Sequence, residues 1–170
     1  MKEILRFFLR RFGALLQKVP SRERGPLNDV VPRRVRFLHQ CFVPVTLVTS
    51  PLAQTVIGHA ISVHRALGPG LFEHAYSQCL EYELESHGVA FRRQVPLSLT
   101  YGTLRLADVY RADLIVEDEL VVELKSIERL LPIHHAQAMT YLKLSGVRQA
   151  LLINFNVRKL TDGIKSFLAQ

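Results

Sequence analysis

From about residue 52 onward, the sequence predicts one α/β domain. Apolar residues recur first at helical spacing and later in the short runs and alternations that are typical of strands. The chain has 170 residues, of which 48% are hydrophobic and 22% charged. That size and composition suit one globular domain with a hydrophobic core and argue against disorder. The predicted order of elements is helix, helix, three strands, helix, strand and helix.

Two helices come first in this order. Residues 53–67 have apolar side chains at helical spacing, and Gly68-Pro69-Gly70 breaks the pattern. A second helix is predicted from about residue 71 to 87, with Gly88 placed to end it. Its predicted apolar face consists of Phe72, Tyr76, Cys79, Leu80 and Leu84.

Three strands follow, and the last two form a predicted hairpin. The first strand lies around residues 95–99, before a turn at Tyr101-Gly102. Residues 105–116 and 120–126 are rich in Leu, Val and Ile, and they flank an acidic tip at residues 117–119. Two apolar runs around a short polar tip are typical of a hairpin.

The C-terminal part is predicted to be helix, strand and helix. The helix covers residues 133–145 and ends at Gly146. Residues 150–155 form an uninterrupted apolar run, which is typical of a strand buried on both faces. We expect a last helix from about Thr161.

The N-terminal segment differs from the rest in charge. Residues 1–50 hold 10 Lys and Arg against 3 Asp and Glu, whereas residues 51–170 hold 12 of each. The net charge of +7 therefore lies wholly in this segment, and bulk charge does not indicate nucleic-acid binding by the remainder. We expect residues 1–50 to be a flexible basic extension and residues 51–170 to be the folded domain. An anchor to a membrane or a partner is the alternative for the extension.

Composition also excludes some classes of protein. No apolar run reaches the ~20 residues that span a bilayer. Cys41 and Cys79 are too few for a disulfide framework, and neither has a partner at zinc-finger spacing. We therefore expect reduced thiols in a cytoplasmic protein, with no cysteine zinc site. His59, His64 and His74 are expected to be surface or helix-packing residues rather than ligands.

The predicted hairpin gathers charged residues on one face. If residues 117–119 form its loop, Asp113 lies opposite or nearly opposite Glu123, at a Cβ separation of ~5 Å. Glu123 and Lys125 are two residues apart, so both project from the same face of their strand. Two carboxylates this close repel each other unless a positive charge lies between them. Mg²⁺ prefers such oxygen ligands, although a plain Glu123–Lys125 ion pair explains the pattern equally well.

Several blocks of the chain resemble a known family. Residues 70–76, Gly-Leu-Phe-Glu-His-Ala-Tyr, match the GxxExxY signature of a family of small bacterial and archaeal proteins. Residues 110–126 look like the central hairpin of that family, and residues 136–146 and 151–156 look like its later blocks. The similarity runs in order from about residue 52 to residue 167. This family is grouped with the PD-(D/E)xK nuclease superfamily, which has the restriction-endonuclease-like fold.

The resemblance implies a mixed central sheet flanked by helices, and Mg²⁺- or Mn²⁺-dependent hydrolysis of phosphodiester bonds in nucleic acid. Carried over by position, Asp113 and Glu123 are metal ligands and Lys125 is the catalytic lysine. Glu73 corresponds to the acidic residue of the first core helix, which serves the metal and catalysis, and Gln137 to a later catalytic helix residue. The sequence departs from the pattern at Ala112, where Pro commonly precedes the aspartate; this position is tolerant in the superfamily.

Three further residues are candidate substrate contacts. Tyr76 lies three residues after Glu73, on the same side of its helix. Arg111 lies two residues before Asp113, where it would contact phosphate or neutralise the carboxylates. Tyr141 shares a helical stripe with Gln137 and His134. The simpler alternatives are a first-turn glutamate favoured by the helix dipole, for Glu73, and a polar helix edge, for the stripe.

Three functions are compatible with these residues. The first is a metal-dependent nuclease that acts on DNA or RNA. The second is a non-catalytic module that keeps the fold and binds nucleic acid or protein. The third is a glycosidase with Glu73 and Glu123 as its carboxylate pair, which ranks low because it gives Lys125 no role.

Overall fold

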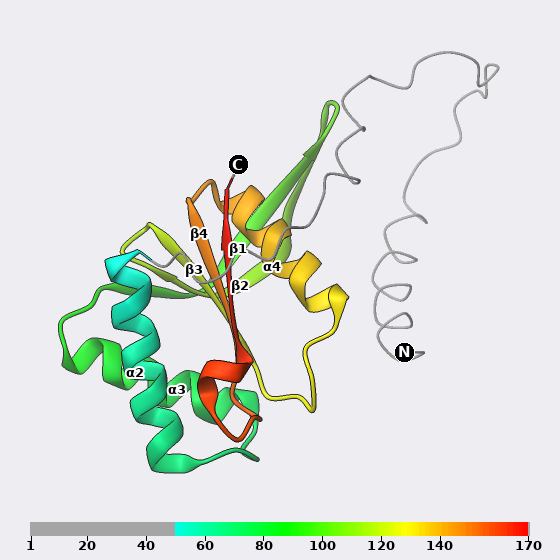
Figure 1. Ribbon diagram of the computed structural model, residues 1–170. Helices are drawn as coiled ribbons and strands as arrows, with labels where there is room; N and C mark the ends of the chain where they lie inside the picture. Colours follow the sequence, from blue (N-terminus) through cyan, green and yellow to red (C-terminus); the bar gives the residue numbers. More distant parts are fainter. Residues whose placement is uncertain (1–49, 170) are drawn as a thin grey trace. The chain divides into compact units, whose positions relative to one another are not determined.

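The computed structural model describes residues 50–169 (Figure 1). The helices and strands of this part of the chain are α2 (Pro51–Leu67), α3 (Glu73–Ser86), β1 (Phe91–Tyr101), β2 (Leu104–Val116), β3 (Leu120–Lys125), α4 (Pro132–Ser145), β4 (Gln149–Asn154), the 3₁₀ turn η1 (Leu160–Gly163) and β5 (Ile164–Leu168). The predicted α/β class, with a mixed sheet flanked by helices, is confirmed.

Five strands form one sheet in the order β1-β2-β3-β4-β5. β3 and β4 are parallel, whereas the other neighbours are antiparallel. The predicted hairpin is confirmed as β2 and β3, which pair Leu114 with Val122 and Val116 with Leu120. A parallel pair cannot be joined by a tight turn, so α4 makes the connection from β3 to β4.

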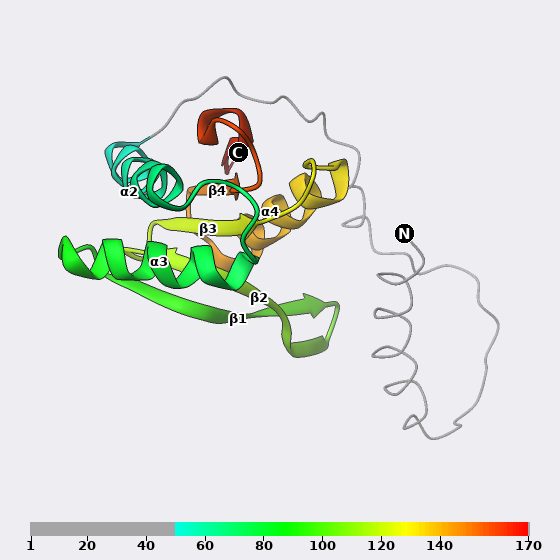
Figure 2. The same ribbon diagram turned by 90° about the horizontal axis from the view of Figure 1, so that it is seen from below.

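Helices cover both faces of the sheet (Figures 1 and 2). One core lies under α2 and α3, where Leu120, Val122 and Leu124 of β3 are buried. A second core lies under α4 and contains Val121 of the same strand. Because side chains alternate along a strand, Glu123 belongs to the α4 face. Every residue of β4 is buried, as predicted for this strand.

The prediction of a C-terminal helix is wrong. Only one 3₁₀ turn forms, at η1, and β5 then pairs antiparallel with β4. Ile164 and Ser166 are buried while Lys165 between them is exposed, which is a strand period of two. The segment is short, so pairing with the otherwise unpaired side of β4 decides its conformation over local propensity.

The start of α3 also differs from the prediction. Phe72 lies outside the helix as its N-cap residue, and it is 90% exposed rather than part of the apolar face. Tyr76, Leu80 and Leu84 are buried as predicted. The helix therefore begins at Glu73, whose carboxylate lies at the positive end of the helix dipole.

Within residues 50–169, no helix is long and apolar enough to cross a membrane. Residues 1–49, which make up nearly all of the predicted basic extension, lie outside the described residues.

Substitution of two glycines by alanine should change the stability of the domain in opposite directions. A Cβ at Gly163 would lie 2.3 Å from the backbone oxygen of Asn154, whereas a Cβ at Gly58 in α2 would meet nothing within 4 Å. We expect Gly163→Ala to lower the free energy of unfolding by about 1–3 kcal/mol through overpacking. Gly58→Ala should raise it by about 0.5–1 kcal/mol, because alanine favours a helix interior. Urea unfolding followed by circular dichroism measures both, and equal stability of the two variants would contradict the packing of η1 against β4.

Candidate active site

Three carboxylates meet one lysine at the C-terminal end of β3. The Nζ of Lys125 lies 2.6 Å from Oε1 of Glu123 and 4.0 Å from Oε1 of Glu73. The Asp113 carboxylate acts electrostatically on all three of these groups. The structure therefore brings together the four charged residues that the sequence singles out, and Lys125 takes part in both ion pairs of this cluster among residues 50–169.

Asp113 is fixed by hydrogen bonds to both neighbouring strands. Its Oδ2 accepts a hydrogen bond from the backbone N–H of Leu124 at 2.9 Å. Its Oδ1 accepts one from the side-chain amide of Gln94 at 3.2 Å. The β2–β3 ladder stops at Leu114 and Val122, so the Asp113 side chain makes the next connection between the two strands. This connection holds the carboxylate at the face where Glu123 lies.

Gln94 is a site residue that the sequence does not reveal. Its φ of 48° is left-handed, which is unusual for a side chain of this type. Such local strain commonly accompanies functional sites, and here it directs an amide donor to Asp113. Arg111, a predicted phosphate contact, is exposed and donates to the backbone oxygen of Gln94 at 3.5 Å. It thus borders the cluster without an ion pair to these carboxylates.

Glu73 comes from the opposite face of the sheet. α3 packs on the first core, and its N-terminal end lies beside the end of β3 (Figure 2). Ser126, directly after β3, joins the two segments: its Oγ donates to the backbone oxygen of Leu71 at 2.5 Å, and its backbone hydrogen-bonds Glu73. Glu73 reaches the cluster around the strand end and keeps 44% of its side chain exposed.

The loop after β3 is held by a buried asparagine. The side chain of Asn154 on β4 accepts from the backbone N–H of Ile127 at 3.1 Å and donates to its backbone oxygen at 2.8 Å. Asn154 pairs with Lys125 in the parallel ladder and is fully buried. It therefore fixes the backbone that leaves the site, a role that the sequence alone does not indicate.

Burial dominates the electrostatics of Glu123. Its side chain is 3% exposed, and burial raises the pKa of its carboxyl to about 8; the Asp113 charge adds to this rise, while Lys125 opposes it. Burial also raises the pKa of Glu73. Lys125 behaves oppositely: burial by itself lowers its pKa, but the three carboxylates outweigh burial and raise it. Lys125 is therefore an ammonium ion at neutral pH.

A cation fits the donors at this site. The Oε2 of Glu123 is buried and has no hydrogen-bond partner, although buried polar atoms are nearly always hydrogen-bonded. Asp113 and Glu73 add negative charge that Lys125 alone does not balance. Carboxylate oxygens of this kind suit a hard divalent ion such as Mg²⁺ or Mn²⁺. Asp113 and Glu123, with Glu73 beside them, are the residues that would hold it.

The predicted stripe on α4 faces the cluster. Gln137 donates from Nε2 to the hydroxyl of Tyr141 at 2.6 Å. Burial raises the pKa of Tyr141, and Glu123 and Asp113 add to the rise. Burial lowers the pKa of His134, as does Lys125. The Gln137–Tyr141 pair thus borders the carboxylates on the side that α4 covers.

Tyr76 serves the fold. It is fully buried and stacks on Phe155 with ring centroids 4.5 Å apart. Its hydroxyl donates to the backbone oxygen of Gly68 at 2.6 Å and accepts from the N–H of Leu71 at 3.2 Å. These bonds hold the loop that delivers Glu73, so Tyr76 offers no surface to a substrate and the expectation of direct contact is corrected to support of the loop.

The histidines fit their predicted roles in part. His64 is buried and its Nε2 bonds the backbone oxygen of Val157 at 2.8 Å, which is a packing role. His74 is exposed. His59 instead meets Glu83 and His87, a grouping that the sequence prediction did not include.

The raised pKa of Glu123 predicts a pH dependence of stability. In the folded state this carboxyl titrates near pH 8, against 4.5 for an unperturbed group. The folded state then binds more protons between these values, so the contribution of Glu123 to the free energy of unfolding falls as the pH rises from about 4.5 to 8. In EDTA, Glu123→Gln should remove this loss, which is on the order of a few kcal/mol.

Urea unfolding at pH 5 and pH 8, in EDTA, measures this difference. Glu119→Gln is the matched control, because Glu119 is exposed at the hairpin tip and should keep the wild-type slope. An identical pH slope in wild type and Glu123→Gln would contradict the burial of an ionisable Glu123.

One of three comparisons with known proteins identifies a family for the chain. A search of curated proteins finds no match. A solved structure titled "Crystal structure of SSO0001" is 20% identical; the similarity covers 64% of this chain and 59% of that one, with a TM-score of 0.36, too low to support an argument. The family model described as PD-(D/E)XK nuclease superfamily matches residues 50–167. The mixed sheet flanked by helices is consistent with the restriction-endonuclease-like fold, and the chain belongs to the PD-(D/E)XK nuclease superfamily.

Proposed function

We propose that this protein is a divalent-cation-dependent nuclease of the GxxExxY group that hydrolyses phosphodiester bonds in DNA or RNA. The observation that carries the proposal is the buried Glu123 carboxylate, whose Oε2 lacks a partner beside Asp113 and Lys125. Nucleases of this superfamily typically use divalent metals, and the signature at residues 70–76 supports the assignment to the group.

Three carboxylates are the proposed ligands of the cation. Asp113 and Glu123 hold the cation, with Glu73 as a further ligand on the more exposed side. When bound, the cation polarises a phosphoryl oxygen and makes water a stronger nucleophile. Gln94 and the Leu124 amide keep Asp113 oriented for this task, so the ligand geometry exists before substrate arrives.

Lys125 acts mainly through its charge. Its raised pKa keeps the ammonium protonated at neutral pH, which favours stabilisation of the negative charge that grows on the phosphate over proton abstraction. Glu123 positions it through the 2.6 Å contact to Nζ. Gln137 and Tyr141 are hydrogen-bonded to each other, border the site from α4 and would orient substrate groups there. The exposed Arg111 is available to a phosphate further along the nucleic acid.

Cleavage assays on single- and double-stranded DNA and RNA test the proposal. With Mg²⁺ or Mn²⁺ present, we expect cleavage of at least one substrate and none in EDTA. Lys125→Ala should lower the rate roughly 100- to 1000-fold, as is typical for loss of one charge-stabilising group. Asp113→Asn should lower the rate at least as much, because it weakens the binding of the cation.

Lys165→Ala is the matched control for loss of a positive charge. Lys165 is exposed on β5, two strands away from β3, and within residues 50–169 it forms no ion pair with these carboxylates, so its variant should cleave at a rate close to wild type. Binding of nucleic acid that needs no metal and survives Lys125→Ala, without cleavage under any condition, would sink the nuclease proposal and favour a non-catalytic module.

A further inference from the structure

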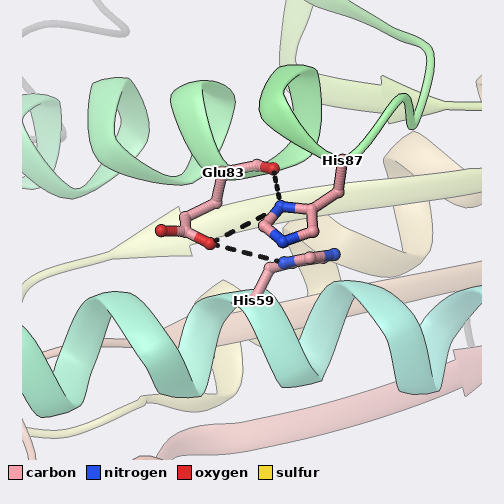
Figure 3. A group of neighbouring side chains, drawn as sticks. All are labelled: His59, Glu83 and His87. Atoms are coloured by element: carbon pink, nitrogen blue, oxygen red, sulfur yellow. Dashed lines mark hydrogen bonds and ion pairs between the residues drawn. The ribbon is translucent and has the colours of Figure 1, made fainter.

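A second group of metal-ligating side chains lies between α2 and α3 (Figure 3). His59 comes from α2, Glu83 from α3 and His87 from the C-cap of α3. One ligand atom of each residue lies within 4.8 Å of the other two. Glu73 begins α3 and Glu83 follows ten residues later, so at ~1.5 Å per residue this cluster is about 15 Å from the carboxylate site.

The spacing of the side chains suits one shared ion. Nδ1 of His59 lies 3.5 Å from Oε2 of Glu83. That is longer than the 2.7–3.2 Å typical of an N–H···O hydrogen bond. It is close to the edge of a zinc tetrahedron, about 3.3–3.4 Å for bonds of about 2.0–2.1 Å. Glu83 and His59 are therefore placed as two ligands of one ion.

The third ligand is oriented by the backbone of its own helix. Glu83 and His87 are four residues apart and so project from one side of α3. Nδ1 of His87 lies 2.8 Å from the backbone oxygen of Glu83. Metal-bound histidines commonly donate their second N–H to such a carbonyl. This leaves Nε2, on the side of the His59 ring (Figure 3), as the ligand atom; the two ring centroids are 4.4 Å apart.

The chemistry of the donors selects the ion. We propose that His59, Glu83 and His87 bind one Zn²⁺ ion that joins α2 to α3. Two imidazoles and one carboxylate form a set that zinc takes in proteins, with water in the fourth position, whereas Mg²⁺ and Mn²⁺ favour oxygen ligands. The His59 side chain is 15% exposed and that of His87 57%, so an ion can enter from solvent.

The proposed ion would stabilise the helix pair that supports the first core. α2 and α3 both pack on that core, and α3 presents Glu73 at its other end. Binding to the folded state alone shifts the folding equilibrium. The site thus belongs to the stability of the domain, and it stands or falls separately from the proposed nuclease function.

Zinc titration of the full chain tests the site. After removal of metal with EDTA, calorimetry with ZnCl₂ should find one such site in the wild type. His59→Gln, Glu83→Gln and His87→Gln should each weaken zinc affinity by about 100-fold or more, because loss of a hydrogen-bonding partner of a ligand alone costs up to about 100-fold. At about 100 times the Kd, Zn²⁺ should raise the Tm of wild type by roughly 5–10 °C. His74→Gln is the matched control, because His74 is an exposed histidine of α3 outside the group.

The carboxylate site and the two cysteines are the competing zinc ligands to be excluded, and the design separates them from the His59 group. Asp113→Asn removes a ligand of the carboxylate site and should leave this zinc site intact. X-ray absorption of the wild-type zinc complex should show nitrogen and oxygen ligands at about 2.0–2.1 Å. It also gives a readout if a variant fails to fold.

Three outcomes would overturn the proposal. One is equal zinc affinity of wild type and the well-folded His59→Gln variant. Another is a sulfur shell at about 2.3 Å, which would assign the zinc to Cys41 or Cys79. The last is a Kd for Zn²⁺ weaker than about 1 mM, which corresponds to less than ~4 kcal/mol of binding free energy.

Discussion

The arrangement of the domain depends on one buried carboxylate. Glu123 occupies a core position of β3, where the residues before it (Leu120 to Val122) and Leu124 after it are apolar and buried. A buried charge is costly unless it is paired and hydrogen-bonded. Lys125 satisfies one oxygen of Glu123, while the other has no partner. The residues around Glu123 therefore have two roles: Lys125 balances its negative charge, and the others hold the groups beside its unpaired oxygen in place.

Much of the surrounding structure fixes the geometry around that carboxylate. The Asp113 side chain bonds β3 where the β2–β3 ladder has stopped. Gln94, whose backbone is left-handed, donates a hydrogen bond to the Asp113 carboxylate. Asn154 and Ser126 hold the loop after β3, so that Glu73 arrives from the far face of the sheet. The proposed ligands come from three elements, yet each is tied to a residue of β3 by a hydrogen bond or ion pair. Such preorganisation is what charge stabilisation in a transition state requires.

What could be predicted from the sequence follows from local periodicity. The alternation along the hairpin suffices to set Asp113 and Glu123 on one face. Contacts between distant segments have no local signal: Gln94 bonds Asp113, nineteen residues away, from a left-handed backbone position in β1. The sequence predicts a helix for the last segment because its pairing with β4 is a tertiary effect. The zinc-type grouping of His59 with the far end of α3 was likewise invisible, since it depends on how α2 and α3 pack.

Asp113 and Glu123 are the residues proposed to hold a hard divalent cation together. Anomalous diffraction from a crystal soaked in Mn²⁺ tests it most directly. We expect a manganese peak within about 2.0–2.3 Å of carboxylate oxygens of both residues, with the Glu123 oxygen that now lacks a partner among them. A crystal with full access to Mn²⁺ and no peak beside Glu123, or with manganese only at the His59 cluster, would contradict it.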